Sequence, residues 1–163
     1  MSSLPGEPKV DTLDALSDLV AQSFDPLYGE AWTPGQLAGV LVQRTTRTLF
    51  IASDGTCNED PTTDAIGFAL SRRVLDEEEL LLFAILPLWR GQGHGRRLLL
   101  DFLARAQENG VARTFLEMRA NNSARDLYEQ SGFRPCGLRK AYYRCGDGTK
   151  LDAITFEHPM STG

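Results

Sequence analysis

The sequence predicts a mixed α/β (α+β) domain in which a mostly antiparallel central sheet is flanked by helices. Three features lead to this prediction: segments with helical periodicity, short apolar runs typical of strands, and glycines where several of these segments end. The chain has 163 residues, 42% of them hydrophobic, which is enough to bury the core of one domain. We therefore expect residues 1–163 to form a single domain, with residues 1–11 as a flexible N-terminal segment.

Two helices are expected before the sheet begins. Apolar residues recur at helical spacing over residues 12–22, with Asp11 or Thr12 as the N-cap. Thr33 followed by Pro34 gives a cap and then a proline at the first helical position, which predicts a second helix through residue 41.

Six apolar runs predict strands, the first two on either side of the polar stretch 54–61 and antiparallel to each other. The run 78–85 is apolar enough to be covered on both faces, and Gly146 and Gly148 mark a turn before the last strand. An earlier strand has only Lys9-Val10 as a candidate. In chain order, the expected strands are residues 49–52, 65–70, 78–85, 111–117, 133–143 and 153–157.

Residues 95–109 form the best-defined helix of the sequence. Leu99, Phe102 and Leu103 lie on one face at helical spacing, and Gly110 stands where a left-handed cap is needed. A shorter helix is expected over residues 122–130, ended by Gly132.

Composition excludes several classes of function. The net charge of −5 argues against bulk nucleic-acid binding, and no apolar run is long enough to span a bilayer. Cys57, Cys136 and Cys145 lack C-x-x-C spacing, and His94 and His158 belong to no metal motif, so we expect reduced thiols and no metal site. The N-terminus lacks a secretion pattern, which favours a cytoplasmic protein.

A glycine-rich loop connects the strand 78–85 to the helix that begins at residue 95. It reads Arg90-Gly91-Gln92-Gly93-His94-Gly95. A helix start offers unpaired amides and partial positive charge, glycines let a phosphate approach, and Arg90, Arg96 and Arg97 add charge. The loop could be only a tight turn, but its arginines favour a pyrophosphate site.

Two other phosphate-binding motifs do not fit this loop. The dinucleotide fingerprint G-x-G-x-x-G, counted from Gly91 and Gly93, needs a third glycine where Arg96 stands. A P-loop needs Gly-Lys followed by Ser or Thr, which this loop lacks.

Two motifs resemble the GNAT superfamily of N-acetyltransferases, over residues 49–159. The glycine loop matches the signature Q/R-x-x-G-x-G/A, and residues 121–128 match N-x-x-A-x-x-L-Y, followed by Gly132-Phe133. The resemblance implies the GNAT fold and acetyl-CoA, with the loop on the pyrophosphate and backbone groups of two strand residues on the pantetheine arm. His94 is expected there without chemistry of its own. The cofactor-binding residues so implied are Phe83, Ile85, Arg90, Gly91, Gln92, Gly93, His94, Gly95, Arg96 and Asn121.

Further segments resemble the RimI-type ribosomal-protein alanine N-acetyltransferases. They are residues 116–121, 127–129, 138–143, 147–148 and 152–154. This resemblance implies Glu117 as general base, Tyr128 as general acid, and Trp32, Tyr142 and Tyr143 at the acceptor site.

The chain departs from the RimI pattern at two places near the acceptor. The stretch from Glu117 to Asn121 is one residue shorter than E-x-x-x-x-N, and a short F-x-x-P-W segment is replaced by the longer residues 24–32. A one-residue shift in a strand turns side chains to the opposite face, so either the loop after Glu117 absorbs the difference or the role of general base does not fall to Glu117.

The resemblance implies that acetyl-CoA acetylates the free α-amino group of a protein N-terminus, an alanine-starting small-subunit ribosomal protein, by direct attack in a ternary complex. Two alternatives stay open: a lysine side chain or a small-molecule amine as the acceptor, and an acetyl-CoA-binding module without catalysis. The sequence leaves the natural acceptor and the oligomeric state undetermined.

Overall fold

The computed structural model describes residues 11–28 and 30–160 and confirms the mixed α/β architecture with a mostly antiparallel sheet. Seven strands form one sheet in the order β2-β1-β3-β4-β5-β7-β6, and only β4 and β5 are parallel neighbours. The helices are α1 (Thr12–Ser23), α2 (Pro34–Leu41), α3 (His94–Glu108) and α4 (Arg125–Gln130), with short 3₁₀ turns η1 (Pro26–Tyr28) and η2 (Pro87–Trp89). The strands are β1 (Thr46–Ala52), β2 (Cys57–Asn58), β3 (Ala65–Val74), β4 (Glu77–Ile85), β5 (Arg113–Arg119), β6 (Arg134–Arg144) and β7 (Lys150–Pro159).

Every expected helix and strand within the described residues is present, with shifted ends. The largest differences are β7, which is longer at both ends, and β3, which ends at Val74 instead of residue 70; α4 begins three residues later than expected. The sequence did not indicate the two-residue strand β2 or either 3₁₀ turn. The candidate strand at Lys9-Val10 lies outside the described residues.

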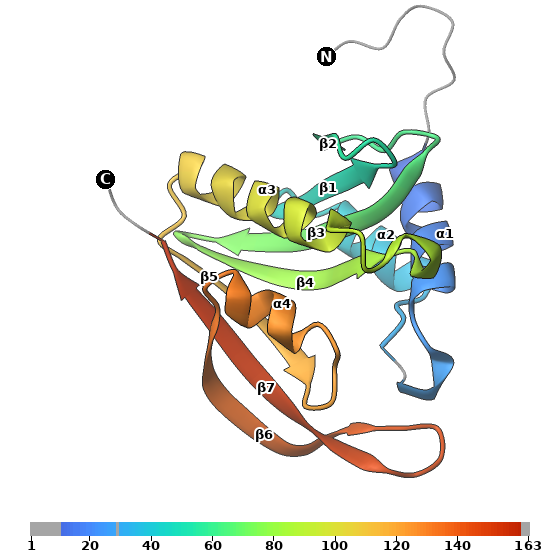
Figure 1. Cartoon of the computed structure of the whole chain (residues 1–163), viewed down its shortest axis with the longest axis vertical. Coiled ribbons are helices and arrows are strands. Elements are labelled where there is room, and N and C mark those ends of the chain that lie inside the picture. The colour runs from blue at the N-terminus through green and yellow to red at the C-terminus, as the bar shows by residue number, and fades with distance from the viewer. Residues whose placement is uncertain (1–10, 29, 161–163) are drawn as a thin grey trace, which may run out of the picture.

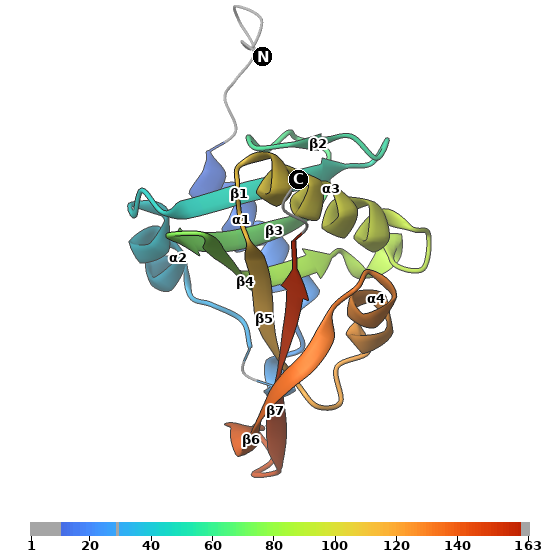
Figure 2. The same cartoon turned by 90° about the vertical axis from the view of Figure 1, so that its left-hand side faces the viewer.

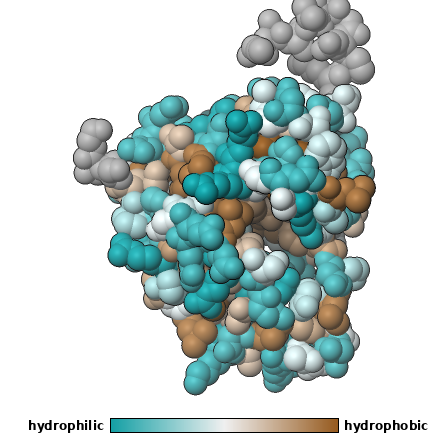
Figure 3. All heavy atoms as spheres, viewed as in Figure 1, coloured by the Kyte–Doolittle hydropathy of each residue, from teal (hydrophilic) through white to brown (hydrophobic). Residues whose placement is uncertain are grey.

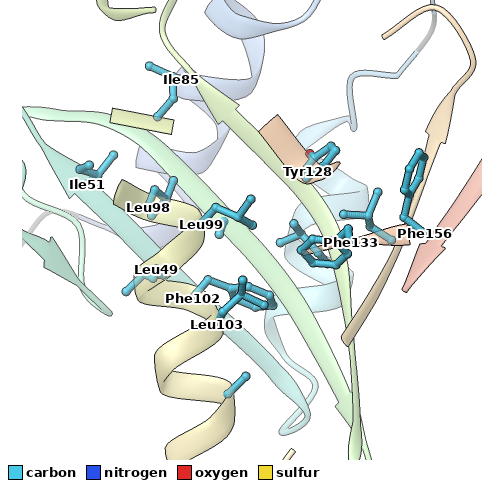
Figure 4. Packing of buried hydrophobic residues seen from close by; sticks show 14 of the residues in the cluster. Leu49, Ile51, Ile85, Leu98, Leu99, Phe102, Leu103, Tyr128, Phe133 and Phe156 are labelled. Carbon is cyan, nitrogen blue, oxygen red and sulfur yellow. The ribbon is translucent and has the colours of Figure 1, made fainter. Parts of the chain in front are cut away.

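Helices cover the sheet on both faces, α1 and α2 behind it and α3 in front (Figure 1). Leu16, Leu19 and Val20 of α1 are buried against the back face, where they meet Phe68 of β3. On the front face the apolar side of α3 forms a second core with β1, α4 and β7 (Figure 4). These cores fix the sheet between two layers, so that the N-terminal end of α3 has a defined place beside β4.

A β-bulge in β4 changes which side chains face each core. Leu70 pairs with Leu82 and Ser71 pairs with Leu80, which leaves Leu81 as the extra residue. Leu80 therefore belongs to the front core, whereas Leu82 belongs to the back core. After the bulge both faces of β4 are covered, as expected from its apolar sequence.

Strands β4 and β5 separate partway along their length. They pair only from Glu77–Leu80 with Arg113–Leu116, and β5 then continues beside β7. In Figure 2, β5 and β7 run at a steep angle to β1, β3 and β4. We call the gap beyond Leu80 and Leu116 the β4–β5 split. Among the helices that the structure describes, none has the length and apolar character needed to cross a membrane.

Candidate active site

The edge of β4 that faces the split presents backbone groups of Phe83 and Ile85. Leu86 donates its amide to the Ile66 carbonyl at 2.8 Å, so the bonds to β3 come from even-numbered residues in this part of β4. Because successive backbone groups in a strand point to opposite edges, Phe83 and Ile85 point toward the split. The backbone groups of Phe83 and Ile85 therefore point in the direction that the predicted contact with the pantetheine arm requires.

The loop before α3 ends in an uncapped helix start. Gly91 and Gly93 have φ of 75° and 87°, a left-handed conformation that favours glycine. Gly93 is the N-cap of α3 and supplies no side-chain bond, and the Arg97 amide donates to the Gly93 carbonyl at 3.1 Å as the first helical bond. The amides just before Arg97 thus have no acceptor within the helix, which is the arrangement that binds anions.

The three arginines of the loop have different surroundings. Arg90 donates from Nε to the Ile85 carbonyl at 2.8 Å and from a terminal nitrogen to the Ser23 carbonyl at 2.7 Å, so it ties β4 to α1. The Arg97 guanidinium lies over Gly55 in the turn before β2. Arg96 and Arg97 are both exposed and line one open hollow with Gly93. Because Arg97 also lies against Gly55, Arg96 is the arginine better placed to meet a phosphate.

Two other loop side chains contribute to the loop's own structure. Gln92 donates from its amide nitrogen to the Leu88 carbonyl at 3.1 Å, and the His94 ring lies edge-on to Trp89 at 5.8 Å between centroids. Gly95 faces the split, where an added Cβ would lie 3.4 Å from Leu127. In the view of Figure 3, a recess with hydrophobic residues at its floor opens beside this loop.

Tyr128 of α4 lies on the front, cofactor side of the split. Its side chain is 6% exposed, and its ring centroid lies 6.1 Å from that of Phe83 and 5.8 Å from that of Phe133. Figure 4 shows Tyr128 and Phe133 in the front core. Burial raises the pKa of Tyr128, and the nearby charge of Glu30 raises it further. The hydroxyl is therefore held in its protonated form, which is the form that a general acid needs.

Glu117 lies on the opposite face of the sheet from Tyr128. Strand β5 pairs with β7 without a bulge from Arg113 to Arg119, and its buried residues alternate with half-buried ones. Leu116 and Met118 join the front core, so Glu117 points to the back. Its carboxylate lies 3.4 Å from Arg139 Nε of β6. The two predicted catalytic groups can therefore meet only through the split.

The turn after β5 lies where the chain is one residue shorter than the RimI pattern. Asn122 accepts the Ala124 amide at 2.8 Å, and α4 begins at Arg125 instead of residue 122. The regular alternation of β5 thus keeps Glu117 on a defined face. Asn121 is the asparagine expected to contact the pantetheine arm. Its side-chain oxygen accepts a hydrogen bond from a terminal nitrogen of Arg119 at 2.7 Å.

The predicted acceptor residues are divided between two places. Tyr142 and Tyr143 on β6 form an edge-to-face pair with centroids 5.3 Å apart, and burial followed by the Glu117 charge raises the pKa of Tyr143 to about 12. Trp32 instead packs against the back core of α1 and α2. The residue of this segment that reaches the split is Glu30, which pairs with Arg119. Sequence reasoning missed both residues, because no local pattern links positions 89 residues apart.

The fold, the split and the uncapped α3 start define an acetyltransferase domain of the GNAT type. A family profile described as "Acetyltransferase (GNAT) domain" matches residues 34–144. The chain belongs to this family, which confirms the resemblance found in the glycine loop and the α4 segment.

The similar proteins include ribosomal-protein alanine N-acetyltransferases. The chain is 44% identical over 89 residues to the [ribosomal protein bS18]-alanine N-acetyltransferase of Haemophilus influenzae, and 41% identical over 95 residues to that of Escherichia coli. These matches cover 55% and 58% of this chain, but only 61% and 64% of the two relatives. The crystal structure of the Escherichia coli ribosomal-protein-S18-alanine N-acetyltransferase is 28% identical, with a TM-score of 0.79 over 96% of this chain and 94% of that one.

Proposed function

We propose that this protein transfers an acetyl group from acetyl-CoA to the free α-amino group of a protein N-terminus, in particular an alanine-starting ribosomal protein of the small subunit. The observation that carries the proposal is the β4–β5 split, which opens beside the uncapped start of α3. The named activity of the similar proteins supports this choice of acceptor. Residues 1–163 would act as one domain in the cytoplasm, where ribosomal proteins are made.

The chain offers one set of groups to each part of acetyl-CoA. The amides of residues 92–96, with Arg96, suit the negatively charged pyrophosphate. Backbone groups of Phe83 and Ile85 suit the amides of the pantetheine arm, as a neighbouring strand would. The thioester would then lie in the split, between the faces that carry Tyr128 and Glu117.

The side chains at the split can perform both proton transfers of the reaction. Acetyl-CoA supplies an activated acyl group, so that a C–N bond to the acceptor forms as the C–S bond breaks. Glu117 accepts the proton that the amine nitrogen loses, directly or through water, and Tyr128 donates a proton to the departing sulfur. Direct attack in a ternary complex needs no covalent enzyme intermediate.

The acceptor is tested with a lysine-containing peptide that starts with alanine, beside the same peptide blocked at its N-terminus. We expect acetylation of the open peptide at the α-amino group, located by mass spectrometry, and no transfer to the blocked one. If only the blocked peptide reacts, the acceptor is a lysine side chain. If neither peptide reacts while acetyl-CoA still binds, a small-molecule amine or a role without catalysis replaces this proposal.

Replacing Arg96 by glutamine should mainly affect the affinity for coenzyme A, whereas replacing Arg90 by glutamine should mainly affect stability. Arg96→Gln should weaken coenzyme A binding by about tenfold at low salt, and by less at high salt, because an exposed charge pair is screened. Arg90→Gln should instead lower the free energy of unfolding by about 1 kcal/mol, since Arg90 bonds to two carbonyl groups. Calorimetry with coenzyme A and thermal melting of both variants measure these effects; equal loss of affinity in both would contradict the assignment.

A further inference from the structure

A charged pair that the proposed mechanism does not use lies at the back of the split. Arg119 ends β5, and its Nε donates to Glu30 in the segment between η1 and α2. The side chains of Arg119 and Glu30 are 15% and 16% exposed. The pair is thus largely shielded from water, although an ion pair loses hydration when it is buried and adds little stability on average.

Several contacts hold Arg119 in one orientation. Its guanidinium carbon lies 3.7 Å from the centroid of the Tyr28 ring, and a terminal nitrogen donates to Asn121 at 2.7 Å. The segment that carries Glu30 is tied to the hairpin of β6 and β7, because the Gly146 amide donates to the Leu27 carbonyl at 2.8 Å. Glu30 is therefore held by β5 through Arg119, and the hairpin holds the same segment at Leu27.

The place of this pair relative to Glu117 follows from strand geometry. Glu117 and Arg119 are two positions apart in a regular strand, so their side chains leave the same face about 7 Å apart. Glu30 bonds to Arg119 and lies close enough to Tyr128 of α4 and Tyr143 of β6 for its charge to act on both hydroxyls. Glu30 thus lies where the cofactor face, the acceptor face and the predicted base meet.

We propose that Glu30 is the residue that binds the acceptor's α-ammonium group before Glu117 removes its proton. This inference rests on the proposed function. A protein N-terminus has a pKa of about 8, so it arrives mostly as a cation at neutral pH and needs a carboxylate to replace its lost hydration. The Glu117–Arg139 pair is the more exposed of the two, whereas Glu30 is held in a largely shielded pair with Arg119. A carboxylate has lone pairs enough to accept from Arg119 and from an ammonium group together.

The assignment also gives Arg119 a positioning role. By holding one oxygen of Glu30, Arg119 orients the carboxylate beside buried Tyr128 and half-buried Tyr143. An acceptor without a positive charge would shield the carboxylate further from water without giving its remaining lone pairs a charged partner. The site would therefore select cationic amines and release the neutral, acetylated product.

The test is the acceptor KM of Glu30→Gln, measured with an alanine-starting peptide that contains no lysine. Glutamine keeps an oxygen for Arg119 but removes the charge. We expect the acceptor KM to rise about 10- to 100-fold at pH 7, and the difference from the wild type to fall to about twofold or less at pH 9.5, where the α-amino group is neutral. The hydroxyls that face Glu30 do not titrate in this range, because the pKa of Tyr143 is about 12 and burial raises that of Tyr128.

Asp25→Asn is the matched control, since it removes one negative charge from the same segment. Asp25 accepts the Leu27 amide at 2.9 Å and is exposed. This variant should keep the acceptor KM within about twofold at both pH values. An unchanged KM in Glu30→Gln, an equal rise at both pH values, or the same rise in Asp25→Asn would each overturn the assignment.

A folding defect is detected separately by the melting temperature and the affinity for coenzyme A, both of which Glu30→Gln should leave near wild-type values. If Glu30→Gln does not fold, Glu30→Asp takes its place, because it keeps the charge but withdraws it by one methylene. Its acceptor KM should rise severalfold at pH 7 and return to the wild-type value at pH 9.5; no rise would overturn the assignment. If the wild type does not acetylate the peptide at all, the proposed function fails instead.

Discussion

Tyr128→Phe should lower kcat by about 100-fold while the affinity for coenzyme A stays within about twofold. The substitution removes only the hydroxyl, and the ring contacts with Phe83 and Phe133 remain. A general acid contributes to the transition state and not to ground-state binding, so the loss appears in kcat. Steady-state kinetics with an alanine-starting peptide and calorimetry with coenzyme A measure the two quantities.

The pH dependence of the wild type gives a second check on Tyr128. Burial raises the pKa of this hydroxyl above the ordinary value near 10, so its protonated form persists as the pH rises through 9. We therefore expect kcat to show no decline between pH 8 and pH 9.5. Unchanged turnover in Tyr128→Phe would remove the tyrosine from the mechanism.

Glu117→Gln should lower kcat by about 100-fold and flatten the rise of kcat with pH. The amine must lose a proton during the reaction, and the variant has no carboxylate at this position to accept it. Removing Glu117 also leaves Arg139 without its ion-pair partner at 3.4 Å, but Arg139 is largely exposed, so we expect little change in stability. The measurement is kcat from pH 6 to pH 9.5 in both proteins.

Glu79→Gln is the matched control for Glu117→Gln. Glu79 is a half-buried carboxylate on β4 that lies near the charges of Glu117 and Arg139, and burial raises its pKa. If Glu117 is the base, the control keeps the shape of the wild-type pH profile. An intact profile in Glu117→Gln would point to water or to another residue, with Glu30 the first to examine.

Local sequence was sufficient to predict most elements of this fold. Helix periodicity and capping residues act over a few positions, so α1, α2 and α3 could be located before the structure was known. The start of α4 was placed three residues early, because Asn122 bonds to the Ala124 amide in a turn. The two-residue β2 exists only through its pairing with β1, which no local pattern signals.

The candidate site was predictable only where its function depends on consecutive residues. The glycine loop is such a case, since the left-handed φ of Gly91 and Gly93 and the uncapped helix start are local properties. Arg90 shows the limit of this reasoning: its charge suggested a phosphate contact, but its guanidinium donates to the carbonyl of nearby Ile85 and to that of Ser23, 67 positions earlier in the chain.

By itself, the sequence determined the class of fold, and it indicated the glycine loop as a candidate phosphate site and, through the RimI resemblance, Glu117 and Tyr128 as catalytic candidates. Tertiary structure alone decided that these two side chains lie on opposite faces of the sheet, and that Glu30 pairs with Arg119 two positions after Glu117. The physical reason is that the β4–β5 split, the bulge in β4 and the Glu30–Arg119 pair all arise from contacts between segments far apart in the chain.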